Sequence, residues 1–354
     1  MSNEPTLKRI LTGARPTGPL HLGHYVGALE NWVRLQDEYD CHFLIADYQA
    51  LGDHLDDILG IRRSVLEVAI DWLAVGLNPE QSTFVVQSYV PEHAELAMLL
   101  AMVTPLGWLE RNPTLKAERE QIEGDGEGAR QQESSGRGER ISVGFFTYPV
   151  SQAADIALPK AHLVPVGEDQ IPHIEMTREV VRRFNRMFGD TFPEPEGLVG
   201  RVARLPGTDG QSKMSKSIGN AIYLKDDVET VNRKIRGMYT DPTRVRADIP
   251  AEPEGNPVFA YHDAFNDDKA EVNDLKDRYR QGKVGDAEVK QKLAVAINRF
   301  MDPIRERRAK YEEQPQAVAE ILMEGSRNSK QVAEATMHEV REKMGILYLK
   351  DGGR

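Results

Sequence analysis

The sequence predicts an α/β fold: a Rossmann-like doubly wound parallel sheet followed by a C-terminal all-helical domain. Two observations carry this prediction. Short apolar runs alternate with amphipathic segments through roughly the first two hundred residues, and strands that alternate with helices form parallel sheets covered on both faces. Beyond Tyr223 the short apolar runs stop and helical patterns remain. We therefore expect one domain at residues 1–222 and another at 223–354, whose last helix could return to the first domain.

The first element is a short strand that leads through a tight turn into a helix. The run L-T-G-A-R-P-T-G-P-L-H-L-G-H starts at Leu11, and a 3.6-residue apolar pattern starts at Leu22. Such a junction gathers backbone N–H groups and the positive end of the helix dipole, which suits phosphate oxygens. His21 and His24 are three residues apart, so both imidazoles can lie on one face and donate to an anion. Taken alone, the stretch fits a simple chain reversal equally well.

The next elements continue the alternation. They are expected as a helix at 22–38, a strand at 41–46, a helix at 57–75, a strand at 83–87 and a helix at 92–102. In such a sheet, ligands bind at the carboxyl ends of the strands, where the turn at 12–18 lies. Residues 124–140, within an insertion at about 120–140, contain a single apolar residue, Ala129, and are expected to form a flexible solvated segment.

A helix is expected within residues 141–157, before a short strand within 162–170. The helical period places Tyr148, Gln152 and Asp155 on neighbouring turns of one face. A lone aspartate on a helix is usually a solvated charge, but Asp155 lies in an otherwise apolar segment. An inward-facing carboxylate needs a hydrogen-bond donor, and a ligand N–H would serve.

The second domain is expected to contain helices at 226–239, 270–280, 286–312 and 316–344. It carries a cluster of basic residues that the pattern favours as a solvated helix face rather than an RNA site. The cluster consists of Arg299, Arg305, Arg307, Arg308 and Lys310.

Composition narrows the class of protein. The single cysteine, Cys41, excludes an internal disulfide and a cysteine-rich zinc site, and it is expected to be buried on a strand. No run has the length of a signal peptide or a membrane span, so we expect a cytoplasmic protein without membrane contact. A net charge of −11 has the wrong sign for a general nucleic-acid coat protein, so any RNA contact should be local.

A second stretch with residues suited to phosphate binding, at 210–220, reads G-Q-S-K-M-S-K-S-I-G-N. Lys213 and Lys216, separated by small polar residues and flanked by glycines, predict a mobile cationic loop that can neutralise a polyphosphate. Together with the first stretch, it resembles the paired signatures of class I aminoacyl-tRNA synthetases. H-L-G-H stands at the position of the HIGH sequence, and K-M-S-K-S is identical to the lysine loop of that family.

Over nearly the whole chain, the order of motifs is similar to that of bacterial-type tryptophanyl-tRNA synthetases. The segments that carry this resemblance are T-G-A-R-P-T-G, H-L-G-H-Y-V-G-A-L, T-Y-P-V-S-Q-A-A-D-I, V-P-V-G-E-D-Q and K-M-S-K-S. The tyrosine enzymes share the fold and the first motif, but A-A-D-I and G-E-D-Q favour tryptophan. The resemblance implies a tryptophan–tRNA ligase that uses ATP carried with Mg²⁺, has no metal site of its own, acts on tRNA(Trp) and works as a homodimer. The helical domain would read the anticodon.

The resemblance also implies roles for particular residues. Asp155 would accept the indole N–H, Gln170 would bind the ammonium group, and Tyr148, Gln152 and Gln49 would complete the tryptophan site. His24, Lys213 and Lys216 would act in catalysis by stabilising phosphate charge. The residues implied to bind ATP are Arg15, Pro16, Thr17, Gly23, His24, Gly167, Glu168, Asp169, Val202, Lys213, Met214, Ser215, Lys216 and Ser217.

The sequence departs from the family at several presumed pocket positions. Arg15 stands where many relatives have Gln, Gln49 where many have His, and Gln152 where Met commonly packs on the indole. His21 and His24 replace residues that are often Thr and Asn. These differences suggest a divergent second copy with a modified pocket. Two alternatives stay open: a tyrosyl-tRNA synthetase, and a non-catalytic paralogue that binds tryptophan or a partner protein.

Overall fold

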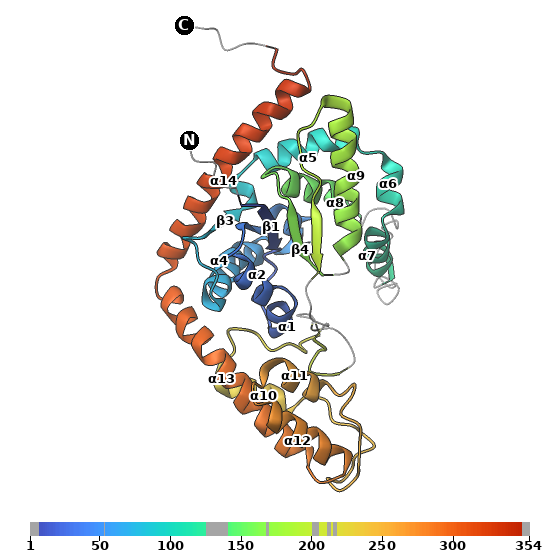
Figure 1. The fold of residues 1–354 in the computed structure, drawn as a ribbon, viewed down its shortest axis with the longest axis vertical. Coiled ribbons are helices and arrows are strands. Elements are labelled where there is room, and N and C mark those ends of the chain that lie inside the picture. Colours follow the sequence, from blue (N-terminus) through green and yellow to red (C-terminus); the bar gives the residue numbers. More distant parts are fainter. Residues whose placement is uncertain are drawn as a thin grey trace.

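The computed structural model describes residues 7–52, 54–124, 141–167, 170–199, 205–210, 214 and 218–348. At its centre lies a sheet of five parallel strands in the order β3-β2-β1-β4-β5 (Figure 1). The strands are β1 (Arg9–Ala14), β2 (Asp40–Ile45), β3 (Ser82–Val86), β4 (Leu163–Val166) and β5 (Glu196–Val199). The predicted parallel sheet is confirmed, and the first four strands lie within a few residues of their expected positions.

Helices cover both faces of this sheet because successive strand residues point to opposite sides. Ile10 of β1 packs in a cluster with Phe43 and Trp72, whereas Leu11 packs in a second cluster with Leu100 and Val180. The first face is covered by α2 (Glu30–Leu35) and α4 (Ile58–Val75), and the second by α5 (Glu92–Val103), α8 (Val143–Ala157) and α9 (Ile171–Phe188). Ile10 and Leu11 of β1 are therefore buried on opposite faces of the sheet, as expected for a strand covered on both sides.

Short helices connect these elements. They are α1 (Leu22–His24), a π-helical stretch (Tyr25–Leu29), α3 (Asp47–Leu51), 3-10 turns at Leu55–Asp57 and Gln87–Tyr89, α6 (Leu106–Arg111) and α7 (Pro113–Gly124). The predicted helix at 22–38 is thus a run of three segments, α-helical, π-helical and again α-helical, that ends at Leu35. Residues 125–140, where a flexible insertion is predicted, lie outside the described part of the chain.

The C-terminal region is helical, as predicted. It contains α10 (Val228–Arg236), α11 (Pro257–Phe265), α12 (Lys269–Arg280), α13 (Asp286–Glu312) and α14 (Pro315–Lys343). Elements absent from the sequence prediction include β5, α9 and α11. For α11 a signal was present, because Asn256 caps the helix and Pro257 occupies its first turn.

The last helix, α14, runs alongside the sheet and covers strand β3 (Figure 1). Ser326 Oγ accepts a hydrogen bond from the Val86 backbone N–H at 3.0 Å, and a Cβ on Gly325 would lie only 2.1 Å from the Phe84 carbonyl oxygen. Only glycine allows this close approach. The helix thereby protects an edge strand that would otherwise expose unpaired backbone groups.

The predicted solvated basic face of α13 is wrong for three of its five residues. Arg308 is 3% exposed and pairs with Asp71 and Glu67 of α4. Arg307 Nε donates to the Ala74 carbonyl at 2.6 Å, and Arg305 Nε donates to the Asp226 carbonyl at 2.9 Å. The contacts of Arg308 and Arg307 fix α13 to α4 of the sheet-containing body, and that of Arg305 lies within the helical region. The remaining two residues, Arg299 and Lys310, are exposed as predicted.

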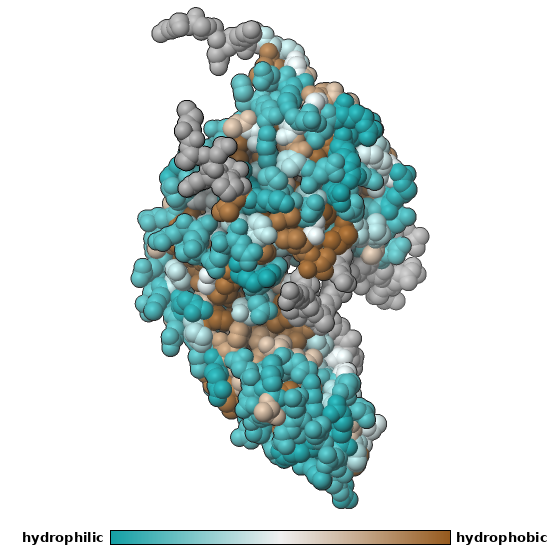
Figure 2. Space-filling view, viewed as in Figure 1, coloured by the Kyte–Doolittle hydropathy of each residue, from teal (hydrophilic) through white to brown (hydrophobic). Residues whose placement is uncertain are grey.

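Polar residues cover both ends of the molecule in the view of Figure 2, and apolar residues appear where the sheet-containing body meets the helical region. Cys41 is fully buried on β2, as predicted, and burial raises the pKa of its thiol to about 12.

Among the described residues, none of the helices is both long and apolar enough to cross a lipid bilayer.

Candidate active site

A cavity of about 350 Å³ opens where β1 and β4 end side by side in the sheet. The chain leaves these two neighbouring strands in different directions, which is the position where ligands bind in open α/β sheets. The end of β1, the helix that follows it, α8 and the residues after β4 all contribute to the walls. Seven residues predicted to bind ATP or tryptophan line the cavity: Arg15, Gln49, Tyr148, Gln152, Asp155, Gly167 and Gln170.

Asp155 is a buried carboxylate in the wall of this cavity, with 2% of its surface exposed. Gln49 Nε2 donates to its Oδ2 at 2.6 Å, and Gln87 Nε2 lies 2.8 Å and 2.9 Å from its two oxygens. His93 Nδ1 lies 2.8 Å from Oδ1. The predicted inward-facing aspartate is confirmed, but protein groups already supply donors to it.

Gln87 and His93 are missing from the sequence prediction of the site. Gln87 follows β3 and His93 begins α5, and their exposed fractions are 0% and 3%. A polar residue at the carboxyl end of a parallel strand was the available signal for Gln87. Within the described residues, no arginine or lysine pairs with Asp155, so the carboxylate is held by neutral amides and an imidazole.

Tyr148 belongs to a second hydrogen-bonded chain on the same wall. Its Oη donates to Glu118 Oε2 at 2.7 Å and lies 2.9 Å from His173 Nε2. Asn112 Nδ2 lies 3.3 Å from His173 Nδ1, so the amide donates to Nδ1 and the imidazole proton is assigned to Nε2. The chain therefore runs from Asn112 through His173 and Tyr148 to Glu118, which also lines the cavity.

His21 and His24 form a reciprocal cap at the start of α1. The His21 backbone N–H donates to His24 Nδ1 at 3.1 Å, and the His24 backbone N–H donates to His21 Nδ1 at 3.3 Å. The rings stack with their centroids 3.7 Å apart. Because each Nδ1 accepts a hydrogen bond, each imidazole is assigned as the neutral form with its proton on Nε2. The predicted common face of the two histidines is confirmed.

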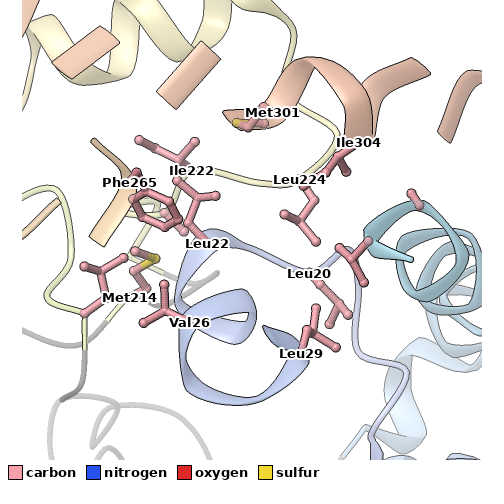
Figure 3. Packing of buried hydrophobic residues seen from close by; sticks show 14 of the residues in the cluster. Leu20, Leu22, Val26, Leu29, Met214, Ile222, Leu224, Phe265, Met301 and Ile304 are labelled. Atoms are coloured by element: carbon pink, nitrogen blue, oxygen red, sulfur yellow. The ribbon is translucent and has the colours of Figure 1, made fainter. Parts of the chain in front are cut away.

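The two signature stretches meet in space. The Leu22 N–H donates to the Ile222 carbonyl and the Leu224 N–H donates to the Leu20 carbonyl, both at 2.9 Å. Met214, at the centre of the lysine loop, packs in the same apolar cluster as Leu22 and Val26 (Figure 3). Its Sδ would lie 3.2 Å from a Cβ on Gly23. Met214, between the two lysines, and residues 222–224, which follow them, are therefore both joined to the histidine turn.

Other predicted residues are placed differently or lie outside the described chain. Five predicted ATP contacts, Pro16, Thr17, Gly23, His24 and Met214, are not among the residues lining the cavity. Those that fall outside the described residues are Glu168, Asp169, Val202, Lys213, Ser215, Lys216 and Ser217.

Comparisons with known proteins agree on one family. The model of "tRNA synthetases class I (W and Y)" matches residues 4–302. A tryptophan–tRNA ligase of Treponema pallidum is 48% identical over 340 residues, which cover 96% of this chain and 97% of the relative. The ligase of Chlamydia caviae is 45% identical, with 96% of each chain covered.

Solved structures show the same similarity. The tryptophanyl-tRNA synthetase of Campylobacter jejuni, complexed with ADP and tryptophan, superposes with a TM-score of 0.80 at 33% identity. The match covers 95% of this chain and 99% of the other. A tyrosyl-tRNA synthetase of Archaeoglobus fulgidus has a TM-score of 0.61 at 23% identity and shares the fold.

Proposed function

The chain belongs to the class I tRNA synthetases of the tryptophan and tyrosine family, and we propose that the cavity beside β1 and β4 is its aminoacylation site. The activity is that of a tryptophan–tRNA ligase, which joins tryptophan to tRNA(Trp) with the use of ATP. The assignment of residues to this reaction depends chiefly on one observation. A buried carboxylate held by two amides and an imidazole, Asp155, faces the cavity next to the joined signature stretches.

In the proposed arrangement, the indole N–H of tryptophan donates to Asp155. Gln87 and His93 would keep the carboxylate in place. The contacts from Gln49, Gln87 and His93 already use both carboxylate oxygens, so the indole N–H must displace the Gln49 amide or share an oxygen with it. Phenylalanine has no matching N–H, so it would leave the carboxylate without this partner. Gln170 lies in the same cavity and would bind the amino-acid backbone.

ATP, carried with Mg²⁺, would bind along the turn after β1. Arg15 and Gly167 line the cavity, and His24 lies at the adjoining helix start. The tryptophan carboxylate attacks the α-phosphorus in line, pyrophosphate leaves, and the activated tryptophan is then transferred to the terminal ribose of the tRNA. This reaction needs no general base or covalent residue. Positioning and stabilisation of negative charge, supplied by imidazoles, backbone N–H groups and the two lysines, are sufficient.

The direct test is aminoacylation of purified tRNA with radiolabelled tryptophan, run beside tyrosine in the same assay. We expect charging with tryptophan and none above background with tyrosine. Charging with tyrosine would indicate the tyrosine enzyme. A protein that binds tryptophan but charges no tRNA would support the non-catalytic paralogue.

The role of the lysine loop can be tested separately. Lys216→Ala should lower the rate of tryptophan activation by about 100-fold, because a cation that stabilises the transition state is lost, while tryptophan affinity stays nearly unchanged. Single-turnover formation of the adenylate measures the rate. Lys310→Ala, on the exposed part of α13, is the matched control. An unchanged rate in Lys216→Ala would remove the loop from the mechanism.

A homodimer in the cytoplasm is also proposed. The outer face of α5 is apolar and exposed: Met98 is 62% exposed and Met102 is 65% exposed, with Leu106 beyond them at 60%. A contiguous apolar helix face marks an interface, and we assign it to a second copy of the chain. Met98→Glu together with Met102→Glu should give a monomer in light scattering. Met187→Glu, at a residue 53% exposed on α9, should leave the dimer intact.

We also propose that the chain divides into a catalytic domain at residues 1–222 and a helical domain at 223–354. Helices α10 to α12 of the second domain would bind the anticodon of the tRNA. The pocket departures at Arg15, Gln49 and Gln152 fit a divergent second copy, because all three residues line the cavity. Affinities for tryptophan and ring-substituted tryptophans, compared with those of a relative that lacks these departures, test this point. An identical affinity profile would argue against a modified pocket.

A further inference from the structure

Glu118 is a carboxylate of the cavity that the residue assignment above leaves without a role. It projects from α7, is half-buried and lines the same cavity as Asp155 and Gln170. Its Oε2 accepts a hydrogen bond from Tyr148 Oη at 2.7 Å. The tyrosine is itself oriented by His173, which is 1% exposed, and the histidine is oriented by Asn112. The half-buried Tyr148 and the buried His173 and Asn112 therefore hold the position of Glu118.

The charges that line the cavity indicate what this carboxylate can bind. Among the described lining residues, the ionisable side chains with full charges are Arg15, Glu118 and Asp155. Asp155 is already held by two amides and an imidazole, which suits a neutral N–H donor. Glu118 accepts one hydrogen bond, from the neutral hydroxyl of Tyr148, and no lysine or arginine among the described residues pairs with it. A ligand with a cationic group would supply such a partner.

We propose that Glu118 is the counter-ion of the α-ammonium group of tryptophan and thereby selects α-amino acids over ligands that lack the amino group. The proposal rests on the placement of the indole at Asp155 made above. Carboxylate–ammonium hydrogen bonds are charge-assisted and stronger than the amide contact available from Gln170. Tyr148 acts as a positioning residue, because it holds the carboxylate without replacing it.

The spacing along α8 agrees with this ligand. Asp155 and Tyr148 are seven residues apart, which corresponds to about 10 Å along a helix, and they lie on the same face. Tryptophan with one hydrogen bond at its indole N–H and another at its ammonium group is about this long. Glu118, hydrogen-bonded to Tyr148 two helical turns before Asp155, would therefore lie at the ammonium end of a ligand whose indole contacts Asp155.

The test compares three ligands that differ in single groups. Dissociation constants are measured by calorimetry for L-tryptophan, for tryptamine, which keeps the ammonium, and for indole-3-propionate, which lacks it. Glu118→Gln keeps the shape and still accepts from Tyr148. It should weaken tryptophan and tryptamine by about 10- to 100-fold and change indole-3-propionate by less than about threefold.

Glu120→Gln, on an exposed position of the same helix, is the matched control and should change none of the three affinities. Tyr148→Phe should weaken the two ammonium ligands by less than Glu118→Gln does, since the carboxylate stays but loses its orientation. Equal losses for all three ligands in Glu118→Gln would show a purely structural role and overturn the proposal. An unchanged tryptophan affinity would do the same.

Failure of the underlying placement gives a different pattern. Asp155→Ala should weaken tryptophan, tryptamine and indole-3-propionate alike, because all three carry the indole. If Asp155→Ala leaves all three affinities intact, the indole lies elsewhere and the placement is wrong. A selective effect of Glu118→Gln on the ammonium ligands would still identify the counter-ion.

Discussion

Two buried aspartates lie in different regions of the molecule and have different partners. Asp155, on α8 in the cavity wall, accepts from neutral donors. Asp71, on α4 beneath the helical region, is fully buried and contacts the guanidinium of Arg308. Its second oxygen accepts the Leu20 N–H at 2.8 Å, immediately before the histidine turn. Both aspartates lie in apolar helical segments, A-A-D-I-A and A-I-D-W-L-A.

The difference between them lies in how the negative charge is compensated. A guanidinium neutralises Asp71 and joins α13 to α4, so this carboxylate stabilises the arrangement of two regions. Neutral amides orient Asp155 without cancelling its charge, so it keeps the capacity to bind a ligand N–H. An apolar sequence context therefore predicts burial of a carboxylate, while the partner decides whether it serves structure or binding.

The largest expected effect follows substitution at the site. Asp155→Ala should lower kcat/KM for tryptophan in the pyrophosphate exchange assay by about a thousandfold or more, because the indole loses its acceptor and the amides of Gln49 and Gln87 lose theirs. The free energy of unfolding should change much less than this loss of activity would suggest. Wild-type-like exchange kinetics would contradict the assignment of Asp155.

Asp71→Ala should show the reverse pattern. We expect the free energy of unfolding to fall by about 3 kcal/mol, because Arg308 stays buried with weaker compensation from Glu67. Tryptophan affinity should stay within about threefold of wild type. Urea titration measures the stability, and labelling of the single buried thiol, Cys41, reports the same opening. A stable variant that cannot bind tryptophan would erase the distinction between the two aspartates.

The two regions should also differ in their response to pH. Burial raises the pKa of Asp71 from its ordinary value of 3.8 to about 6, despite the lowering effect of Arg308. The folded state therefore holds this proton more tightly than the unfolded state, so the contribution of Asp71 to stability falls as the pH rises from about 4 to about 6. Asp71→Asn lacks this dependence.

Paired urea titrations of wild type and Asp71→Asn across that pH range measure the effect. The stability of the variant relative to wild type should increase between pH 4 and pH 6 and then level off. A constant difference across the range would show that the carboxyl titrates alike in the folded and unfolded states.

The smallest effect is expected at Gln49, which makes one of the contacts to Asp155. Gln49→Ala removes a donor that the indole N–H replaces on binding, so tryptophan affinity should change by less than about tenfold. Calorimetry with tryptophan measures this change. A loss as large as that of Asp155→Ala would show that Gln49 itself binds the ligand.

Much of the fold and part of the site could be predicted from the sequence, because local patterns carry them. Alternating apolar and amphipathic segments predict the parallel sheet, since both faces of its strands must be buried. The helical period places Tyr148, Gln152 and Asp155 on one face, and all three line the cavity. The two signature stretches indicate the family because their motifs are recognised from the sequence alone, without knowledge of tertiary contacts.

Only the tertiary structure decided the partners. Gln87 and His93 reach Asp155 from the turn after β3 and from α5, and Arg308 meets Asp71 across 237 positions of the chain. The periodicity of apolar residues predicts that one face of a helix or strand is buried, but it does not predict which segment of the chain covers that face. For a buried charge, the donor within hydrogen-bond distance determines its role, and that donor comes from a distant part of the sequence.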